Sequence, residues 1–256
     1  MRPLILVSND DGIAAPGIRA LAEAMAELGD VVIAAPITEQ SAVGHAITIR
    51  EPVRAHPWPK EAFPFAEAAY AVTGTPADCV KLALSALVSR RPSLVVSGIN
   101  NGANTAVNVI YSGTVSAATE GTMLGIDSIA FSLAEFGQTD FSDAARWANR
   151  VAEAVLQRGL PPGLLLNVNI PHAVDSGVRG VRITRQARSR WEDDYQTRHD
   201  PQNQPYYWNG GRFVNLEADA TDTDLAAIDA GYVSVTPIHY DLTVRSYMSE
   251  LETWGL

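Results

Sequence analysis

The sequence contains a single cysteine, Cys79, so the chain cannot form an intramolecular disulfide bond. Cys79 lies in an apolar helical pattern, which favours a buried, unreactive thiol over a nucleophile. No apolar run reaches the roughly 18 residues that a membrane-spanning helix needs. The first residues, MRPLILVSNDDG, show no signal-peptide cleavage site and are typical of a first strand. We therefore expect a cytoplasmic protein that does not bind membranes.

Basic residues are scarce: 19 Lys and Arg stand against 29 Asp and Glu, which gives a formal net charge of −10. A protein that binds nucleic-acid duplexes needs a basic surface to displace counterions, so this class is disfavoured. An acidic surface also repels phosphorylated ligands at long range. Any phosphate site would therefore need local compensation from a metal ion or from helix N-termini.

Several common catalytic signatures are absent. The sequence has no Walker A pattern, no G-x-S-x-G elbow, no H-E-x-x-H motif and no C-x-x-C pair. These absences exclude the usual forms of nucleoside triphosphatase, serine hydrolase and zinc enzyme.

Residues 1–170 alternate short β-branched runs with amphipathic stretches, a pattern that predicts an α/β fold with a mostly parallel sheet and helices on both faces. The apolar residues of the strands are consecutive, as in strands covered on both sides. We predict strands at residues 4–8, 31–35, 94–97, 128–132 and 164–170, and helices at 17–28, 77–88, 114–124 and 141–157.

The pattern changes after residue 170. A further strand is predicted at 179–186, and residues 185–212 form a polar, aromatic-rich stretch whose Pro and Asn-Gly-Gly signals indicate a hairpin or a long excursion. A segment of this length usually packs on something, and a second subunit is a candidate. A helix, strand and helix follow between residues 224 and 251. We expect one domain over 1–256, with a core at 1–170 and a C-terminal extension at 171–256.

Two adjacent carboxylates, Asp10 and Asp11, follow the first predicted strand. Ligands of open α/β sheets bind at the carboxyl ends of strands, and a turn at Gly12 would let both side chains face one cation. Carboxylate oxygens suit Mg²⁺ or Mn²⁺. An Asx-turn that caps the next helix is the alternative.

Further polar loops follow other predicted elements. Residues 39–45, which include Ser41 and His45, form a weak motif that a simple turn with a solvated His also explains. Residues 97–104 contain Asn100, Asn101 and Asn104, whose carbonyls could ligate a metal or hold a substrate, although left-handed turns also use Asn and Gly.

Two helix starts complete the set of motifs. Ser112 precedes Gly113 and Thr114, where a helix N-terminus would offer amides and hydroxyls to a phosphate, or Ser112 would serve only as an N-cap. Residues 74–78 resemble a second helix start, and here a purely structural role is favoured over a ligand site. Lys81, one turn further on, is interpreted as a solvated charge. Together, the loops and the first of these helix starts match metal-assisted phosphoryl hydrolysis.

Taken together, these motifs resemble those of the SurE family of survival proteins. The matching runs occur in the family's order and cover most of the chain: LVSNDDGIAAPGI, APITEQSAVGHAIT, VTGTPADCVKLAL, LVVSGINNGAN and YSGTVSAATEG. The resemblance implies a Rossmann-like core with C-terminal elements exchanged or paired between subunits, which gives homodimers or homotetramers. It also implies a metal-dependent 5′- and 3′-nucleotidase.

The resemblance implies specific site residues. One Mg²⁺ or Mn²⁺ ion would be held by Asp10, Asp11, Ser41 and Asn100, with Asp10 and Asp11 also catalytic. Phosphate contacts are expected at Ser112, Gly113 and Thr114, and we add substrate contacts at Asn9 and Asn104. The sequence departs from the family after Asn104, where Leu-Gly followed by Asp is usual and Thr105-Ala106-Val107-Asn108 stands here.

The predicted reaction is hydrolysis of nucleoside 5′-monophosphates, with 3′-monophosphates and short polyphosphate as further candidates. The metal would polarise the phosphoryl group and activate water, while His45 would act as a leaving-group acid or structurally. Three alternatives remain open: a covalent aspartyl-phosphate at Asp10, a nucleotide-binding regulator without turnover, and an oligomeric scaffold built around residues 206–208.

Overall fold

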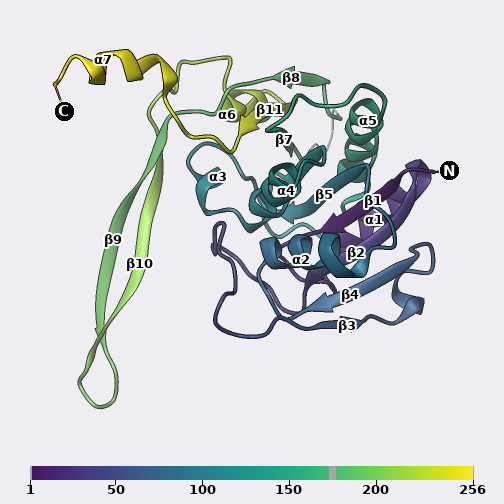
Figure 1. The fold of residues 1–256 in the computed structure, drawn as a ribbon. Coiled ribbons are helices and arrows are strands. Elements are labelled where there is room, and N and C mark those ends of the chain that lie inside the picture. Colours follow the sequence, from purple (N-terminus) through teal and green to yellow (C-terminus); the bar gives the residue numbers. More distant parts are fainter. Residues whose placement is uncertain (1, 173–176, 256) are drawn as a thin grey trace.

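A nine-stranded sheet forms the centre of the protein (Figure 1). The computed structural model describes residues 2–172 and 177–255. The strands lie in the order β3-β4-β2-β1-β5-β6-β7-β11-β8. Their bounds are β1 Leu4–Ser8, β2 Asp30–Pro36, β3 Ala55–Pro57, β4 Ala68–Val72, β5 Leu94–Asn101, β6 Ser128–Leu133, β7 Leu164–Ile170, β8 Val181–Ile183 and β11 Val233–His239.

The sheet is mostly parallel, as predicted. Six consecutive strands from β4 to β7 run in one direction, β3 is antiparallel to β4, and β11 is antiparallel to β7. Every residue of β1 and β6 is buried, which agrees with the prediction of strands that are covered on both sides. The carboxyl ends of the parallel strands share one edge of the sheet, where the polar loops of the sequence lie.

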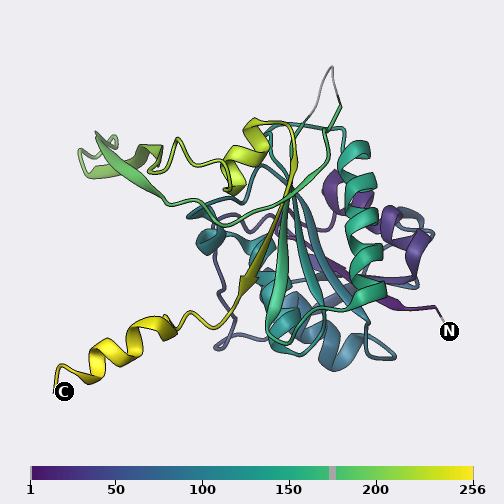
Figure 2. The same ribbon diagram turned by 90° about the horizontal axis from the view of Figure 1, so that it is seen from above.

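Helices cover both faces of the sheet (Figure 2). On one face, α1 (Pro16–Leu28) and α5 (Ser142–Arg158) bury a large apolar cluster against the strands. On the other face, α2 (Pro76–Leu82), its π-helical continuation and α4 (Gly113–Met123) pack over a second cluster. The second face matters for the site, because α2 and α4 both begin near the carboxyl edge.

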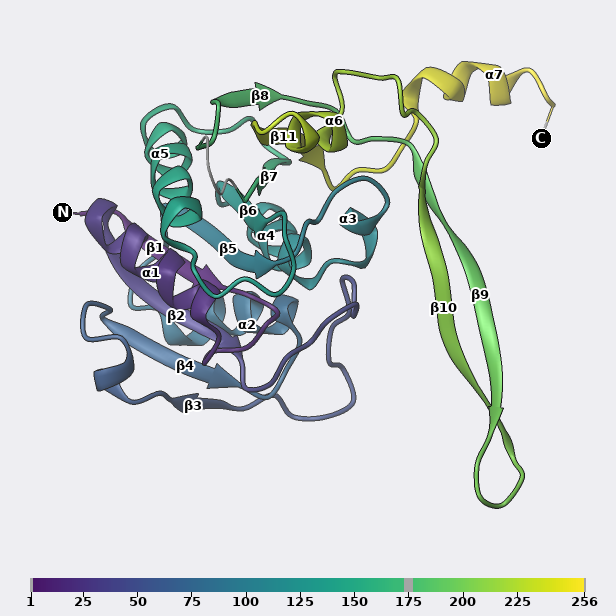
Figure 3. The ribbon, with the colours of Figure 1, turned by 180° about the vertical axis from the view of Figure 1, so that it is seen from behind.

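A long hairpin projects away from the body of the protein (Figures 1 and 3). Its strands are β9 (Ser189–His199) and β10 (Pro205–Asn215), which form a separate two-stranded sheet. The chain then returns through α6 (Asp224–Asp229) and β11, and it ends in an exposed segment that contains a 3-10 turn (Arg245–Tyr247) and α7 (Met248–Glu252). The polar, aromatic-rich stretch of the sequence is therefore a hairpin with little cover from the rest of the chain.

Some elements differ from the predictions. The short strands β3 and β4, the turn of helix α3 (Asn108–Tyr111) and a 3-10 turn at Lys60–Ala62 were not predicted. The strand expected at 179–186 covers only β8. The division at residue 170 remains a prediction, but β8 and β11 belong to the same sheet as the strands before it. Among the described residues, every helix is too short or too polar to cross a bilayer.

Candidate active site

The turn after β1 places two carboxylates at the carboxyl edge of the sheet. Asn9 is buried, and its Nδ2 donates a hydrogen bond to the carbonyl oxygen of Gly12 at 2.9 Å. Gly12 has a φ of 96°, a left-handed conformation that glycine adopts without a steric penalty. The turn is thereby closed, and Asp10 and Asp11 lie between its ends.

Asp10 is held against the start of α4. Its side chain is 6% exposed, and its Oδ1 accepts a short hydrogen bond from the hydroxyl of Thr114. Gly113 packs directly on this carboxylate: a Cβ at Gly113 would lie 2.7 Å from Asp10 Cβ and 2.9 Å from Asp10 Oδ2. Only glycine therefore allows the helix start to approach Asp10 this closely.

Asp11 faces the end of β5. The backbone N–H of Asn101 donates to Asp11 Oδ2 at 3.3 Å, so the end of β5, which also carries Asn100, approaches this carboxylate. Asn100 Nδ2 donates to the carbonyl oxygen of Gly102 at 2.7 Å. Because the amide nitrogen is engaged there, the side-chain oxygen of Asn100 is the atom that can ligate a cation.

The loop that follows β2 reaches the same turn. The backbone N–H of Gln40 donates to the carbonyl oxygen of Asp10 at 2.8 Å. The next residue, Ser41, donates its hydroxyl proton to Glu39 Oε1 at 2.5 Å. This bond uses the proton, whereas ligation uses an oxygen lone pair, so the two roles of Ser41 are compatible.

The electrostatics of the turn favour a bound cation. Burial raises the pKa of Asp10, although the hydrogen bond from Thr114 opposes this shift. Burial, together with the charge of Asp10, raises the pKa of Asp11 to about 6. None of the ion pairs among the described residues includes either carboxylate. A divalent cation would relieve both the burial and the repulsion.

The available donors are oxygen atoms. In the part of the chain that the structure describes, no group of three or more His, Cys, Asp and Glu side chains is arranged to hold a metal. Two carboxylates, an amide oxygen and a hydroxyl are instead a set that suits a hard cation with some retained waters, such as Mg²⁺ or Mn²⁺. The residues present therefore fit the predicted ion.

The N-terminus of α4 provides an anion site beside the carboxylates. Ser112 is the N-cap, and its Oγ accepts from the N–H of Val115 at 3.0 Å. The first amides of a helix have no partners within it, so those of Gly113 and Thr114 can serve a phosphate that the helix dipole also favours. The structural and the functional interpretations of this motif are thus compatible.

The predicted substrate contacts Asn9 and Asn104 are engaged with protein groups. Asn104 is buried, its Nδ2 donates to Ser132 Oγ at 2.9 Å, and its N–H donates to Asn169 Oδ1 at 2.8 Å. Asn9 similarly holds the turn at Gly12. Both residues support the site from beneath, and their contact with a substrate remains a prediction.

The loop at residues 105–108, which departs from the pattern that the resemblance implies, is held by hydrogen bonds to other parts of the chain. Ala106, which stands where the family usually has Gly, adopts a φ of 51°. Its N–H donates to Asp224 Oδ2 at 2.8 Å, and its carbonyl oxygen accepts from Gln186 Nε2 at 2.6 Å. Residues of the C-terminal part therefore hold this loop in a conformation that costs an alanine about 1 kcal/mol.

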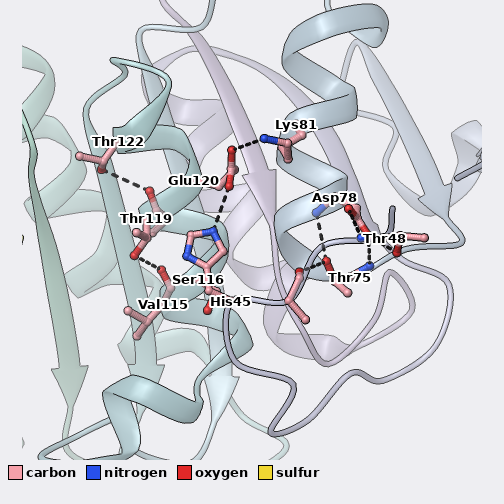
Figure 4. Close-up of polar contacts among 12 residues, drawn as sticks. His45, Thr48, Thr75, Asp78, Lys81, Val115, Ser116, Thr119, Glu120 and Thr122 are labelled. Atoms are coloured by element: carbon pink, nitrogen blue, oxygen red, sulfur yellow. Dashed lines mark hydrogen bonds and ion pairs between the residues drawn. The ribbon is translucent and has the colours of Figure 1, made fainter. Parts of the chain in front are cut away.

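One polar cluster near the site was not predicted. Glu120 in α4 is buried and pairs with both His45 and Lys81 (Figure 4). Lys81 is exposed, as expected for a solvated charge, but its ammonium also lies 2.9 Å from Glu120 Oε1, a pairing that was not predicted. Asp78 at the start of α2 has the predicted structural role, since it forms a capping box with Thr75.

A cleft is lined by residues of the loop after β2, of α3 and of the hairpin. It has a volume of about 760 Å³ and lies between α3 and the base of the hairpin. Two of its lining residues, Ala42 and Tyr111, are the direct neighbours of Ser41 and Ser112. Aromatic side chains line it as well: Tyr111, Trp191 and Tyr195.

Comparisons with known proteins agree with this geometry. The family model described as "Survival protein SurE" matches residues 5–193. A protein of Moorella thermoacetica named "5'-nucleotidase SurE" is 50% identical over 251 residues, covering 98% of this chain and 95% of its own. A protein of the same name from Christiangramia forsetii is 46% identical over 257 residues, with 100% and 98% covered.

A solved structure has the same fold. The crystal structure of the SurE protein from Aquifex aeolicus superimposes with a TM-score of 0.85 at 38% sequence identity, covering 99% of this chain and 100% of that chain. This agreement extends over the sheet, the helices and the C-terminal part. Together with the match to the family model, it shows that the chain belongs to the SurE family.

Proposed function

We propose that the protein is a divalent-metal-dependent phosphomonoesterase that hydrolyses nucleoside 5′-monophosphates to nucleoside and phosphate. The observation that carries this proposal is the contact between Asp10 and the start of α4, which joins a cation site to an anion site. The relatives named 5'-nucleotidase SurE support the reaction class.

Asp10, Asp11, Ser41 and Asn100 would hold one Mg²⁺ or Mn²⁺ ion. When bound, such an ion supplies Lewis acidity toward a phosphoryl oxygen and lowers the pKa of a coordinated water. This role accounts for two close carboxylates that form no ion pair among the described residues.

The chain's own groups would divide the remaining work. The amides of Gly113 and Thr114 hold phosphate oxygens as charge develops on them. Asp11 is better suited than Asp10 to accept a proton from the attacking water, because it is more exposed. Asp10, which is fixed by Thr114, would act chiefly as a ligand.

The nucleoside would occupy the cleft between α3 and the hairpin. A volume of about 760 Å³ is in the range of pockets for small organic ligands. Tyr111, Trp191 and Tyr195 offer aromatic faces on which a base can stack. Two of the cleft's lining residues, Ala42 and Tyr111, directly adjoin in sequence the proposed ligand Ser41 and the helix cap Ser112.

The hairpin and the C-terminal segment would mediate assembly into a homodimer or homotetramer. Both segments expose large apolar side chains, including Tyr207, Trp208, Leu242 and Trp254. Such a surface is expected to be covered by another copy of the chain. A cytoplasmic location is also proposed, which a single buried thiol supports.

Phosphate release from a panel of nucleoside monophosphates tests the function. We expect activity with Mn²⁺ or Mg²⁺, its loss in EDTA, and a decrease of at least about 100-fold in Asp10→Asn and Asp11→Asn. Asp30→Asn is the control, because Asp30 pairs with Arg90 at the opposite edge of the sheet. Full turnover in EDTA, or nucleotide binding without phosphate release, would contradict the proposal.

A further inference from the structure

Glu120 is a buried carboxylate that joins three separate parts of the chain, because it pairs with the more exposed His45 and Lys81 (Figure 4). Its side chain, in the second half of α4, is only 3% exposed. One carboxylate oxygen, Oε1, accepts from Lys81 Nζ of α2 at 2.9 Å, and the other, Oε2, lies 2.9 Å from His45 Nε2. Both oxygens are therefore engaged, and neither is free to contact a substrate or a metal.

His45 belongs to the loop that carries the proposed ligand Ser41, four residues earlier. The part of this loop between them is weakly held: Ser41 and Ala42 are exposed, and Ala42 and Gly44 both have a φ of 57°. The hydrogen bond from Gly44 N–H to the carbonyl oxygen of Tyr111 is 3.1 Å long. An exposed ligand on such a segment needs a fixed point nearby.

The far end of the loop is anchored independently. Thr48 donates its N–H and its hydroxyl to Asp78, and Thr75 Oγ1 donates to the carbonyl oxygen of Ala46 at 2.7 Å. The start of the loop is fixed by Gln40, whose N–H donates a hydrogen bond to the carbonyl oxygen of Asp10. The contact between His45 and Glu120 lies between these anchors and ties the middle of the loop to α4.

Glu120 is charged at neutral pH. Burial alone would raise its pKa, but the hydrogen bonds from His45 and Lys81 outweigh burial and lower it. A buried carboxylate with two such partners has one favoured position, because displacing either partner leaves the charge unpaired. The cluster is therefore rigid enough to serve as a reference point for the loop.

We propose that Glu120 is a positioning residue that acts through His45 to hold Ser41 at the metal site. This inference rests on the proposed function, since it assumes that Ser41 is a ligand. It gives α4 two roles, because the first turn of the helix offers amides to the phosphate and the third turn fixes the metal-binding loop. The same helix would thus align the cation and the anion sites.

Mn²⁺ binding, measured by electron paramagnetic resonance of the free ion, tests the inference without activity as the readout. The variants are Glu120→Gln, His45→Asn and the double variant, with Asp30→Asn as a matched loss of an ion pair far from the loop. We expect the Kd for Mn²⁺ to rise about tenfold in each single variant and no further in the double variant. Activity of Glu120→Gln should return close to that of the wild type at saturating Mn²⁺.

The outcomes separate this inference from the proposed function. An unchanged Kd in folded Glu120→Gln and His45→Asn overturns the positioning role, as does a loss confined to Glu120→Gln. If Glu120→Gln does not fold, His45→Asn carries the test, because its imidazole is partly exposed. Failure of the wild type to bind Mn²⁺, or unaltered binding in Asp10→Asn, contradicts the proposed function instead.

Discussion

The hydroxyl of Thr114 donates a hydrogen bond to Oδ1 of Asp10, a residue 104 positions earlier in the chain. This contact fixes the carboxylate that follows the first strand against the first turn of α4. It also stabilises the charged form of a buried acid, because the bond lowers the pKa of Asp10 against the effect of burial.

Thr114→Val is expected to weaken metal binding. Without the hydroxyl, the pKa of Asp10 rises further and protons compete better with the cation. We expect a 10- to 100-fold decrease in Mn²⁺ affinity or activity, which is about the effect of losing a group that orients a metal ligand. Thr114→Ser keeps the donor and should behave as the wild type; equal losses in both variants would contradict this role.

Metal affinity should depend on pH through Asp11. A carboxylate binds a metal in its deprotonated form, and the pKa of Asp11 is about 6. Titrations with Mn²⁺ between about pH 5 and about pH 8 should show affinity falling as pH decreases through 6, by about tenfold for each pH unit below it. In Asp11→Asn this dependence should become weaker, since only Asp10, whose pKa is also raised, remains to titrate. An unchanged dependence would assign it to another group.

Asp11→Asn should stabilise the metal-free protein while it inactivates the enzyme. The pKa of Asp11 is raised above its unfolded value of 3.8, so its contribution to stability is full below that value and is lost as pH rises through about 6. The uncharged amide avoids this loss. In EDTA at neutral pH we expect the free energy of unfolding to increase by on the order of 1 kcal/mol, measured by urea denaturation.

Two controls check the origin of this stability difference. The gap between variant and wild type should close below about pH 3, where Asp11 is mostly protonated in both the folded and the unfolded states. Excess Mn²⁺ should reverse the order, because a ligand that binds the native state stabilises it by mass action. A gap that is independent of pH would point to altered packing.

The sequence predicted the central strands well because they are short segments rich in apolar residues; β1 and β7 have the predicted bounds. The strand β4 was missed because AAYAV is short and rich in alanine, which has a low strand propensity. The Asp10 and Asp11 turn was recognisable because it follows a strand directly. The pairing of Lys81 with Glu120 could not be recognised from the sequence, because the two residues are 39 positions apart on different helices. Each charge alone is typical of a solvated helix face.

The hairpin should control the oligomeric state. The strand β10 exposes three aromatic side chains, Tyr206, Tyr207 and Trp208. Among the described residues, β9 and β10 form a sheet only with each other. Replacing these three residues with serine should yield monomers in light scattering, whereas Gln204→Ser at the hairpin tip should not. A monomeric wild type would contradict the proposed assembly, and an unchanged mass in the triple variant would assign it to another surface.

The position of β11 between β7 and β8 affects how the protein is made. During translation, β7 leaves the ribosome long before residues 233–239 are synthesised, because the whole hairpin and α6 come first. Until then, the nascent chain presents β7 as an open edge, which is a template for pairing with other chains. Newly made protein is therefore expected to be most prone to aggregation before β11 joins the sheet, and this interval is when a chaperone would protect it most effectively.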